Sequence, residues 1–182
     1  NVTLQQLALA EQQGTAELHD YLIMSASGSL QFDEGMRDLL KSQLSNSDIA
    51  PRIANNFPDK TFTVETKRVD DCLAELGIEQ VDVVKMDIEG AEIGALRGMQ
   101  QTIANSPNLA LVMEFNPQAL EGFGHDPAAA LAEVVAMGFS QVQRIEADGS
   151  LTDLTNRQAA IQQMAKTLSE NMGVVNLLLT RR

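Results

Sequence analysis

The sequence predicts a doubly wound α/β fold, and the centre of the chain carries this prediction. Residues 81–86 and 109–115 are short, largely apolar runs, typical of strands that are buried on both faces. Between them, from Gly90 onward, apolar residues recur every three or four positions, which indicates one face of an amphipathic helix. A strand, a crossover helix and a further strand form a right-handed parallel unit, so both strands should end at the same edge of one sheet.

The N-terminal part of the chain contains three further predicted strands, a loop-rich excursion and a helix. Residues 1–10 begin as a strand at the first residue, and residues 15–24 alternate as an antiparallel strand does. Residues 25–60 are rich in Ser, Gly, Asn and Asp, so we interpret them as an excursion that could cap a site. Regular alternation resumes with a strand over residues 61–69, followed by a helix that Gly77 ends.

The C-terminal part alternates in the same way. A helix is predicted from Asp126 as N-cap to Gly138, with Pro127 in its first turn. A strand over residues 139–147 and a turn come next. A helix follows whose apolar residues share one face, and an apolar strand over residues 173–180 closes the chain.

Composition indicates one globular domain over residues 1–182 with a small-molecule partner. The 44% hydrophobic content excludes general disorder, and the net charge of −12 disfavours nucleic acid, which binds basic surfaces. No run has the length of a membrane span, and Cys72 is the single cysteine, so we expect a cytoplasmic protein without disulfides or a thiolate metal site. Because the chain starts within a strand and without Met, we expect it to be N-terminally truncated.

Two segments, "TKRVDDCLAELGIEQVDVVKMDIEGAEIGALRGM" and "LVMEFNPQAL", resemble the FkbM family of S-adenosylmethionine-dependent methyltransferases. The matching pattern begins with Thr66, Val69, Asp70 and Asp71, continues through residues 85–92, and ends with Leu96, Arg97 and Gly98. "Asp-x-Glu-Gly-x-Glu" between a buried strand and a helix is its most specific part. The resemblance therefore rests on several short motifs in a consistent order.

The resemblance implies a Rossmann-like methyltransferase sheet and S-adenosylmethionine as cofactor. Such a sheet has a glycine-rich loop after its first strand and an acidic residue after its second, and neither occurs in this sequence. We therefore expect a sheet that lacks its first two strands and has an antiparallel last strand. The resemblance also places Leu7, Ala8 and Leu9 near the cofactor's adenine, although core packing would explain these apolar residues equally well.

Carboxylates at the predicted sheet edge are the candidate catalytic residues. Open α/β sheets bind ligands at this edge, and methyl transfer to oxygen requires a group that removes the hydroxyl proton. Asp87, which ends its strand, is the first candidate for both catalysis and cofactor binding, and Glu89 is the second. Glu114 and Asn116 end the neighbouring strand, where they could orient the acceptor.

Asp87 and Glu89 also have a structural interpretation. Asp87 or Glu89 could only cap the helix that begins near Gly90, where the helix dipole favours an anion. Glu92, inside the first helical turn, is interpreted as structural, and Lys85 shares a strand face with Asp87, which predicts an ion pair.

His125, in the glycine-flanked loop "GFGHDP", is a candidate general base, with a solvated loop residue as its structural alternative. Asp87, Glu114 and His125 could together offer oxygen and nitrogen ligands, but their spacing is not diagnostic, and we predict no metal.

Three other functions share parts of this sequence pattern. A receiver-like binding module also has an Asp at the end of an apolar strand. It needs a Ser or Thr at the end of the next strand and a Lys at the end of the one after. Here the next strand ends in "EFNP" and the last in "LLLTRR". A cyclic-dinucleotide phosphodiesterase has similar strands in the reverse order. A non-catalytic α/β remnant is a third alternative. The sequence therefore favours an S-adenosylmethionine-dependent O-methyltransferase that acts on a hydroxyl group of a sugar or secondary metabolite.

Overall fold

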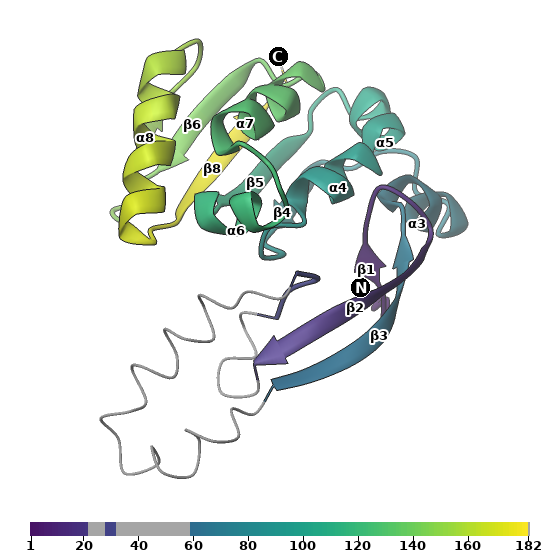
Figure 1. The fold of residues 1–182 in the computed structure, drawn as a ribbon. Coiled ribbons are helices and arrows are strands. Elements are labelled where there is room, and N and C mark those ends of the chain that lie inside the picture. The colour runs from purple at the N-terminus through teal and green to yellow at the C-terminus, as the bar shows by residue number, and fades with distance from the viewer. Residues whose placement is uncertain (22–27, 32–58, 182) are drawn as a thin grey trace, which may run out of the picture.

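The computed structural model describes residues 1–21, 28–31 and 59–181, and these residues form two β-sheets with helices (Figure 1). Most of the predicted excursion over residues 25–60, and the end of the strand predicted over residues 15–24, lie outside the described residues. Within the described ranges, no helix combines the length and the apolar character that crossing a membrane requires.

The smaller sheet has three strands in the order β1-β3-β2. β2 (Gly14–Tyr21) and β3 (Asp59–Lys67) pair in antiparallel register, and this confirms the antiparallel strand predicted here. β1 (Ala8–Leu9) pairs with β3 in parallel. The strand predicted from residue 1 is therefore wrong for residues 1–7. The side chains of Val2 and Leu4 are 95% and 89% exposed, so they do not gain the burial that would stabilise a strand here.

The larger sheet has five strands in the order β4-β5-β8-β6-β7. Its strands are β4 (Val83–Met86), β5 (Ala110–Phe115), β6 (Gln141–Ile145), β7 (Leu151–Asp153) and β8 (Val175–Thr180). β4 and β5 are parallel, as predicted, and β8 is antiparallel to both β5 and β6, which confirms the antiparallel last strand. β7, which the sequence analysis missed, closes a hairpin with β6.

β4 differs from the prediction of a strand buried on both faces. It begins at Val83, and the Val83 side chain is 65% exposed. Among the described residues β4 is an edge strand that pairs with β5 alone, so one side of its backbone has no neighbouring strand. An apolar run in the sequence shows that a strand forms, but not which neighbours cover it.

Six helices accompany the strands of the described region, and their bounds are α3 (Val69–Glu75), α4 (Glu92–Arg97), α5 (Gln100–Asn105), α6 (Pro117–Gly122), α7 (Pro127–Ala136) and α8 (Gln158–Asn171). The single helix predicted from Gly90 is thus two short helices. Its apolar face is nevertheless confirmed, because the four predicted residues are at most 1% exposed; they are Ile93, Leu96, Met99 and Ile103.

One face of the larger sheet carries the core. Leu111, Met113 and Phe115 of β5 are at most 1% exposed, whereas the residues between them are only half-buried. Helices α4 to α8 all contribute side chains to the core cluster on this face (Figure 1). The α/β class is confirmed. A doubly wound sheet also needs helices on its second face, and that part of the fold, like the Rossmann-like arrangement with missing strands, stays a prediction.

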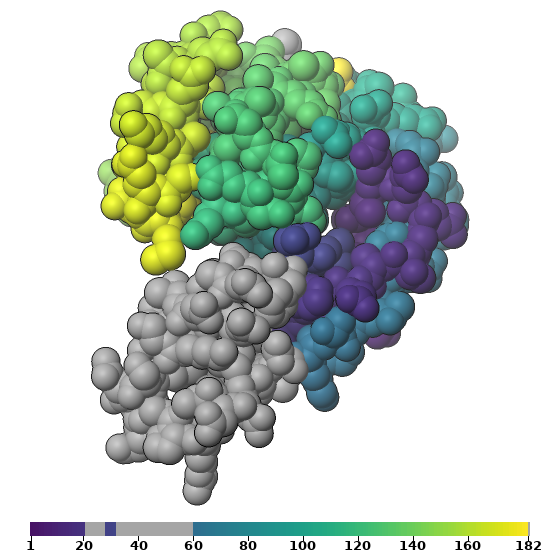
Figure 2. Space-filling view, in the orientation of Figure 1, coloured from purple at the N-terminus to yellow at the C-terminus, as the bar shows by residue number. Residues whose placement is uncertain are grey.

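The segment after β1 packs directly against the helical layer. A Cβ atom on Gly98 would lie 2.3 Å from the carbonyl oxygen of Ala10, so only glycine permits this approach. Arg97 adds ion pairs to Glu11 at 3.4 Å and to Glu133 at 2.6 Å. Figure 2 shows the N-terminal residues, in purple, lying against the teal surface formed by the middle of the chain.

Candidate active site

Three carboxylates converge where the parallel strands β4 and β5 end. The register pairs Lys85 with Val112 and Met86 with Met113, which places Asp87 and Glu114 at the same edge. One carboxylate oxygen from each of Asp87, Glu89 and Glu114 lies within 4.8 Å of the other two. The prediction that Asp87 and Glu114 meet at one sheet edge is therefore confirmed.

A left-handed turn brings Glu89 into this group. Glu89 has φ 54°, and the following Gly90 has φ 99°. A Cβ atom on Gly90 would lie 2.7 Å from the Phe123 ring and 2.8 Å from the Ala119 carbonyl oxygen, so this position requires glycine. A left-handed conformation costs a residue other than glycine roughly 1–2 kcal/mol. Strain of this kind is concentrated at functional sites.

Glu89 and Glu114 hold their protons more tightly than ordinary glutamate side chains do. Burial, followed by the negative charges of Asp87 and Glu89, raises the pKa of Glu114 to about 7, although Lys85 opposes the shift. Burial also raises the pKa of Glu89, again with help from Asp87. Lys85 lies 3.1 Å from Asp87, and both side chains are about half exposed, so the predicted ion pair forms at the rim of the site.

Neighbouring polar groups hold the turn in place. Glu92 is 3% exposed, and its Oε1 accepts a hydrogen bond from the Ile88 backbone N–H at 3.1 Å, in agreement with the structural role predicted for it. The N-cap of α4 is Ala91, and no described side chain caps it, so the interpretation of Asp87 or Glu89 as a helix cap is wrong. Asn116 instead caps α6 by accepting from the Ala119 N–H at 3.1 Å.

The Asn116 side chain also acts on the Glu89 carboxylate, because it opposes the rise in the pKa of Glu89. Asn116 therefore connects the end of β5 to the Glu89 turn. The predicted set Asp87, Glu89, Glu114 and Asn116 lies together in the structure.

A cavity of about 650 Å³ lies beside the carboxylates, between the smaller sheet and the end of β4. Its lining includes the apolar residues Leu7, Ala8 and Leu9, and also Asp87 and Glu89. The structure thus places the three residues expected near adenine in the same cavity as two of the carboxylates. Whether they bind a cofactor stays a prediction.

His125 lies apart from this group. It sits in the loop between α6 and α7, where its backbone N–H donates to the Leu120 carbonyl at 3.0 Å. Its charge acts on Glu133, whose pKa is lowered mainly by the hydrogen bond from Arg97 and less by His125. The His125 side chain is not part of the group that Asp87, Glu89 and Glu114 form at the sheet edge. The structure therefore gives no support to His125 as the general base.

Sequence reasoning missed Asn176, which lies opposite Glu114 in the pairing of β5 with β8. Side chains directly opposite in an antiparallel pair lie on the same face of the sheet. The Asn176 Oδ1 atom is buried and has no hydrogen-bond partner in the described part of the chain. Its position depends on the register of two strands far apart in sequence, so no local pattern could reveal it.

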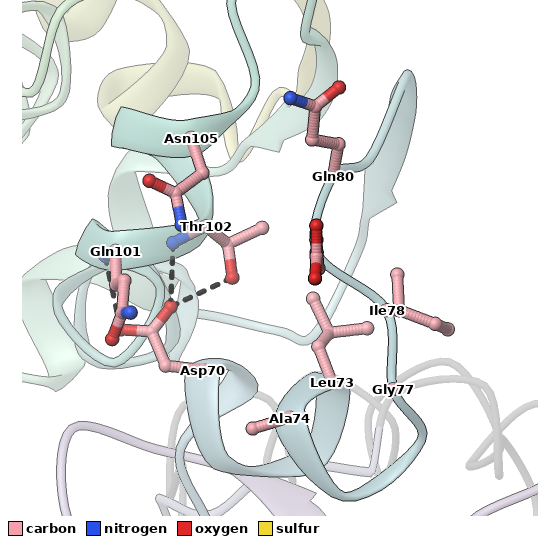
Figure 3. A pocket seen from close by; sticks show the side chains of 10 residues that line it. Asp70, Leu73, Ala74, Gly77, Ile78, Gln80, Gln101, Thr102 and Asn105 are labelled. Carbon is pink, nitrogen blue, oxygen red and sulfur yellow. Dashed lines mark hydrogen bonds between the residues drawn. The ribbon is translucent and has the colours of Figure 1, made fainter.

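A second cavity, of about 510 Å³, lies between α3 and α5 (Figure 3). Its polar residue Asp70 has a structural role. The Asp70 carboxylate accepts hydrogen bonds from the Gln101 N–H at 3.1 Å and from both the N–H and the hydroxyl of Thr102 at 2.8 Å. These groups are at the N-terminus of α5, where free N–H groups require acceptors. Asp70 of the "Val-Asp-Asp" motif therefore caps a helix far along the chain.

Comparison with known proteins identifies the family of this chain. The family described as "Methyltransferase FkbM domain" matches residues 1–141, which is more than half of the chain. The chain belongs to the FkbM methyltransferase family. The family recognised from the sequence motifs is therefore confirmed, and this membership argues against the receiver-like module and the phosphodiesterase.

One curated relative of this FkbM-family chain is 2-O-methyltransferase NoeI from Sinorhizobium fredii (strain NBRC 101917 / NGR234). It is 38% identical over 48 residues, which are 26% of this chain and 20% of NoeI. The chain thus matches about a fifth of the length of that relative. No solved structure matches the chain at a significant level.

Proposed function

We propose that the protein containing this FkbM-family chain is an S-adenosylmethionine-dependent methyltransferase that acts on a hydroxyl group of a sugar or another metabolite. The observation that carries the proposal is the convergence of Asp87, Glu89 and Glu114 beside the 650 Å³ cavity. Family membership supports methyl transfer, and the name of the relative, a 2-O-methyltransferase, supports oxygen as the acceptor atom.

The cavity has the chemistry that this cofactor requires. Its volume is within the range of roughly 300–1,000 Å³ that is typical of ligand sites. Leu7, Ala8 and Leu9 offer an apolar wall for adenine, and Asp87 and Glu89 offer negative charge for a sulfonium. When bound, the cofactor would supply an electrophilic methyl group. The residues present therefore fit its apolar and cationic parts.

Glu114 is the proposed general base. Methyl transfer to a hydroxyl group would release the hydroxyl proton, so the site needs a group that accepts it. The Glu114 carboxylate would take this proton, and its pKa of about 7 suits a base that works near neutral pH. Asn116 and Glu89 would orient the acceptor, since Asn116 follows β5 at the same edge and acts on the Glu89 carboxylate.

The first test is binding of the cofactor to the full-length protein. Isothermal titration with S-adenosylmethionine and S-adenosylhomocysteine should give micromolar affinity, and Asp87→Ala should weaken S-adenosylmethionine more than the uncharged product. Failure of the full-length protein to bind either compound would contradict the proposal and favour the non-catalytic remnant.

The second test is methyl transfer from labelled S-adenosylmethionine to a panel of sugars and hydroxylated metabolites. Glu114→Gln should lower the rate by roughly 10²- to 10⁴-fold, the range typical of general-base catalysis. The wild-type rate should rise with pH through about 7 as Glu114 loses its proton. Glu121→Gln, at a glutamate on α6 that bonds to Ser169, is the matched control and should keep the wild-type rate. Equal rates for both variants would exclude Glu114 as the base.

A further inference from the structure

Ser29 is a buried residue from the N-terminal part of the chain that reaches the Glu89 turn. Its hydroxyl donates a hydrogen bond to the Glu89 carbonyl oxygen at 2.8 Å, across 60 residues of sequence. Ser29 is 9% exposed, so this hydrogen bond is largely shielded from water. The two backbone hydrogen bonds that it exchanges with His19, at 2.8 and 3.1 Å, hold Ser29 against β2. The smaller sheet is therefore bonded directly to the turn that carries Glu89.

The Glu89 turn is held from two sides. Ser29 bonds to the carbonyl oxygen of Glu89, while Gly90 packs tightly against Phe123 of the neighbouring helix segment. Gly28 and Leu30, on either side of Ser29, line the same cavity as Asp87 and Glu89. Ser29 thus contacts the one residue of the carboxylate group whose backbone is in a strained, left-handed conformation. A strained conformation persists only where the surrounding structure over-determines it.

We propose that Ser29 is a positioning residue, whose hydroxyl fixes the left-handed turn at Glu89 and so holds the Glu89 carboxylate beside Glu114 and Asn116. Without the hydroxyl, the Glu89 peptide loses a buried donor and the turn can relax toward an unstrained conformation. The Glu89 carboxylate would then move away from Glu114, and the cavity would lose part of its charged wall. The role of Ser29 in catalysis rests on the function proposed above, whereas its effect on the position of Glu89 does not.

Carbon-13 NMR titration of the glutamate carboxyl groups in the full-length protein tests this directly. In Ser29→Ala the pKa of Glu114 should fall below about 7, because one of the three carboxylates that raise it has moved, while burial and Asp87 still act on it. Affinity for S-adenosylhomocysteine should weaken roughly three- to tenfold, as expected for one lost hydrogen bond. Ser29→Thr keeps the hydroxyl, and it should restore both values.

Ser106→Ala is the matched control. Ser106 is also buried, at 1% exposure, and its hydroxyl accepts a hydrogen bond from the Val81 N–H at 3.0 Å, near the opposite end of β4. This variant should lose stability and yet keep the wild-type pKa of Glu114, because Ser106 does not contact the Glu89 turn. The comparison separates a local effect on the site from a general loss of stability.

Two results would be decisive against the inference. An unchanged pKa of Glu114 in Ser29→Ala would overturn it, and so would an equal shift in Ser106→Ala. Absence of S-adenosylhomocysteine binding to the wild type, together with a shifted pKa in Ser29→Ala, would instead contradict the proposed function and support the positioning role. The two proposals can therefore fail separately.

Discussion

Glu114 and Asp87 lie at the ends of two neighbouring parallel strands, and an oxygen of one carboxyl group is within 4.8 Å of an oxygen of the other. Two unit charges at the upper limit of 4.8 Å repel by about 3.5 kcal/mol at an effective dielectric constant of about 20. This repulsion adds to the effect of burial and raises the pKa of Glu114. The site is therefore able to accept a cation or a proton near neutral pH, and this property leads to the first two predictions.

Binding of a cationic ligand should release protons from the carboxylates, whereas binding of its neutral counterpart should not. S-adenosylmethionine carries a sulfonium charge that S-adenosylhomocysteine lacks, and a nearby positive charge favours the ionised form of Glu114. Titration calorimetry at pH 7 in buffers of different ionisation enthalpy should show more protons released with the methylated ligand, by up to about one. Glu114→Gln should reduce the difference. Equal proton release for both ligands would contradict the prediction.

The free energy of unfolding should respond to the titration of Glu114. Because its pKa is raised from 4.5 to about 7 in the folded state, the folded chain binds more protons than the unfolded chain between these two values. The contribution of Glu114 to stability is therefore present below about pH 4.5 and is lost as the pH rises through about 7.

Urea unfolding at pH 5 and pH 8 measures this effect. The wild type should lose more stability between the two pH values than Glu114→Gln does, and the control Glu121→Gln should behave as the wild type. An identical loss in Glu114→Gln and the wild type would show that Glu114 titrates normally.

Asp70→Ala should lower stability without changing the proposed cofactor site. Its carboxylate satisfies three donors at the start of α5, and losing a buried, charged acceptor at a helix N-terminus costs about 1–3 kcal/mol. Asp71→Ala, in the same turn of α3, is the control and should cost less than about 0.5 kcal/mol. Thermal unfolding and S-adenosylhomocysteine titration measure the two quantities. A specific loss of affinity in Asp70→Ala would assign this residue to the site instead.

Two glycines near α4 should respond in opposite ways to alanine. Gly98→Ala would place a Cβ atom 2.3 Å from the Ala10 carbonyl oxygen, and overpacking of this kind costs about 1–3 kcal/mol. Gly94→Ala, inside the same helix, would meet its nearest atom at 3.9 Å, and it should stabilise the helix by up to about 1 kcal/mol. Chemical unfolding of both variants measures the difference. Equal stability would show that the segment after β1 can move away from α4.

Much of the fold could be predicted from local patterns. A short apolar run predicted β5, and the period of the apolar residues predicted the buried face shared by Ile93 and Leu96. Asp126 was correctly predicted as an N-cap, because a cap depends on residues within one helical turn. The predicted boundaries are wrong at β1 and at the break between α4 and α5, because contacts with distant segments decide where these elements begin and end. The break includes Gly98, where the chain makes room for Ala10.

Part of the candidate site could likewise be predicted from the sequence, and part could not. That Asp87 and Glu114 follow apolar strands was visible in the sequence, and parallel pairing then brought them to one edge. The exclusion of His125 from that edge was not visible, because loop residues have no period that fixes their direction. The hydrogen bond from Ser29 to Glu89 likewise joins segments that no local signal connects.

The sequence by itself determined the α/β class, the FkbM family and the carboxylates at the strand ends, because apolar periodicity and short motifs are local properties of the chain. Tertiary structure alone decided that β4 is an edge strand among the described residues, that Asp70 caps α5, and that burial and neighbouring charges raise the pKa of Glu114 to about 7. The reason is physical: burial, charge repulsion and long-range hydrogen bonds depend on distances between residues that are far apart in sequence.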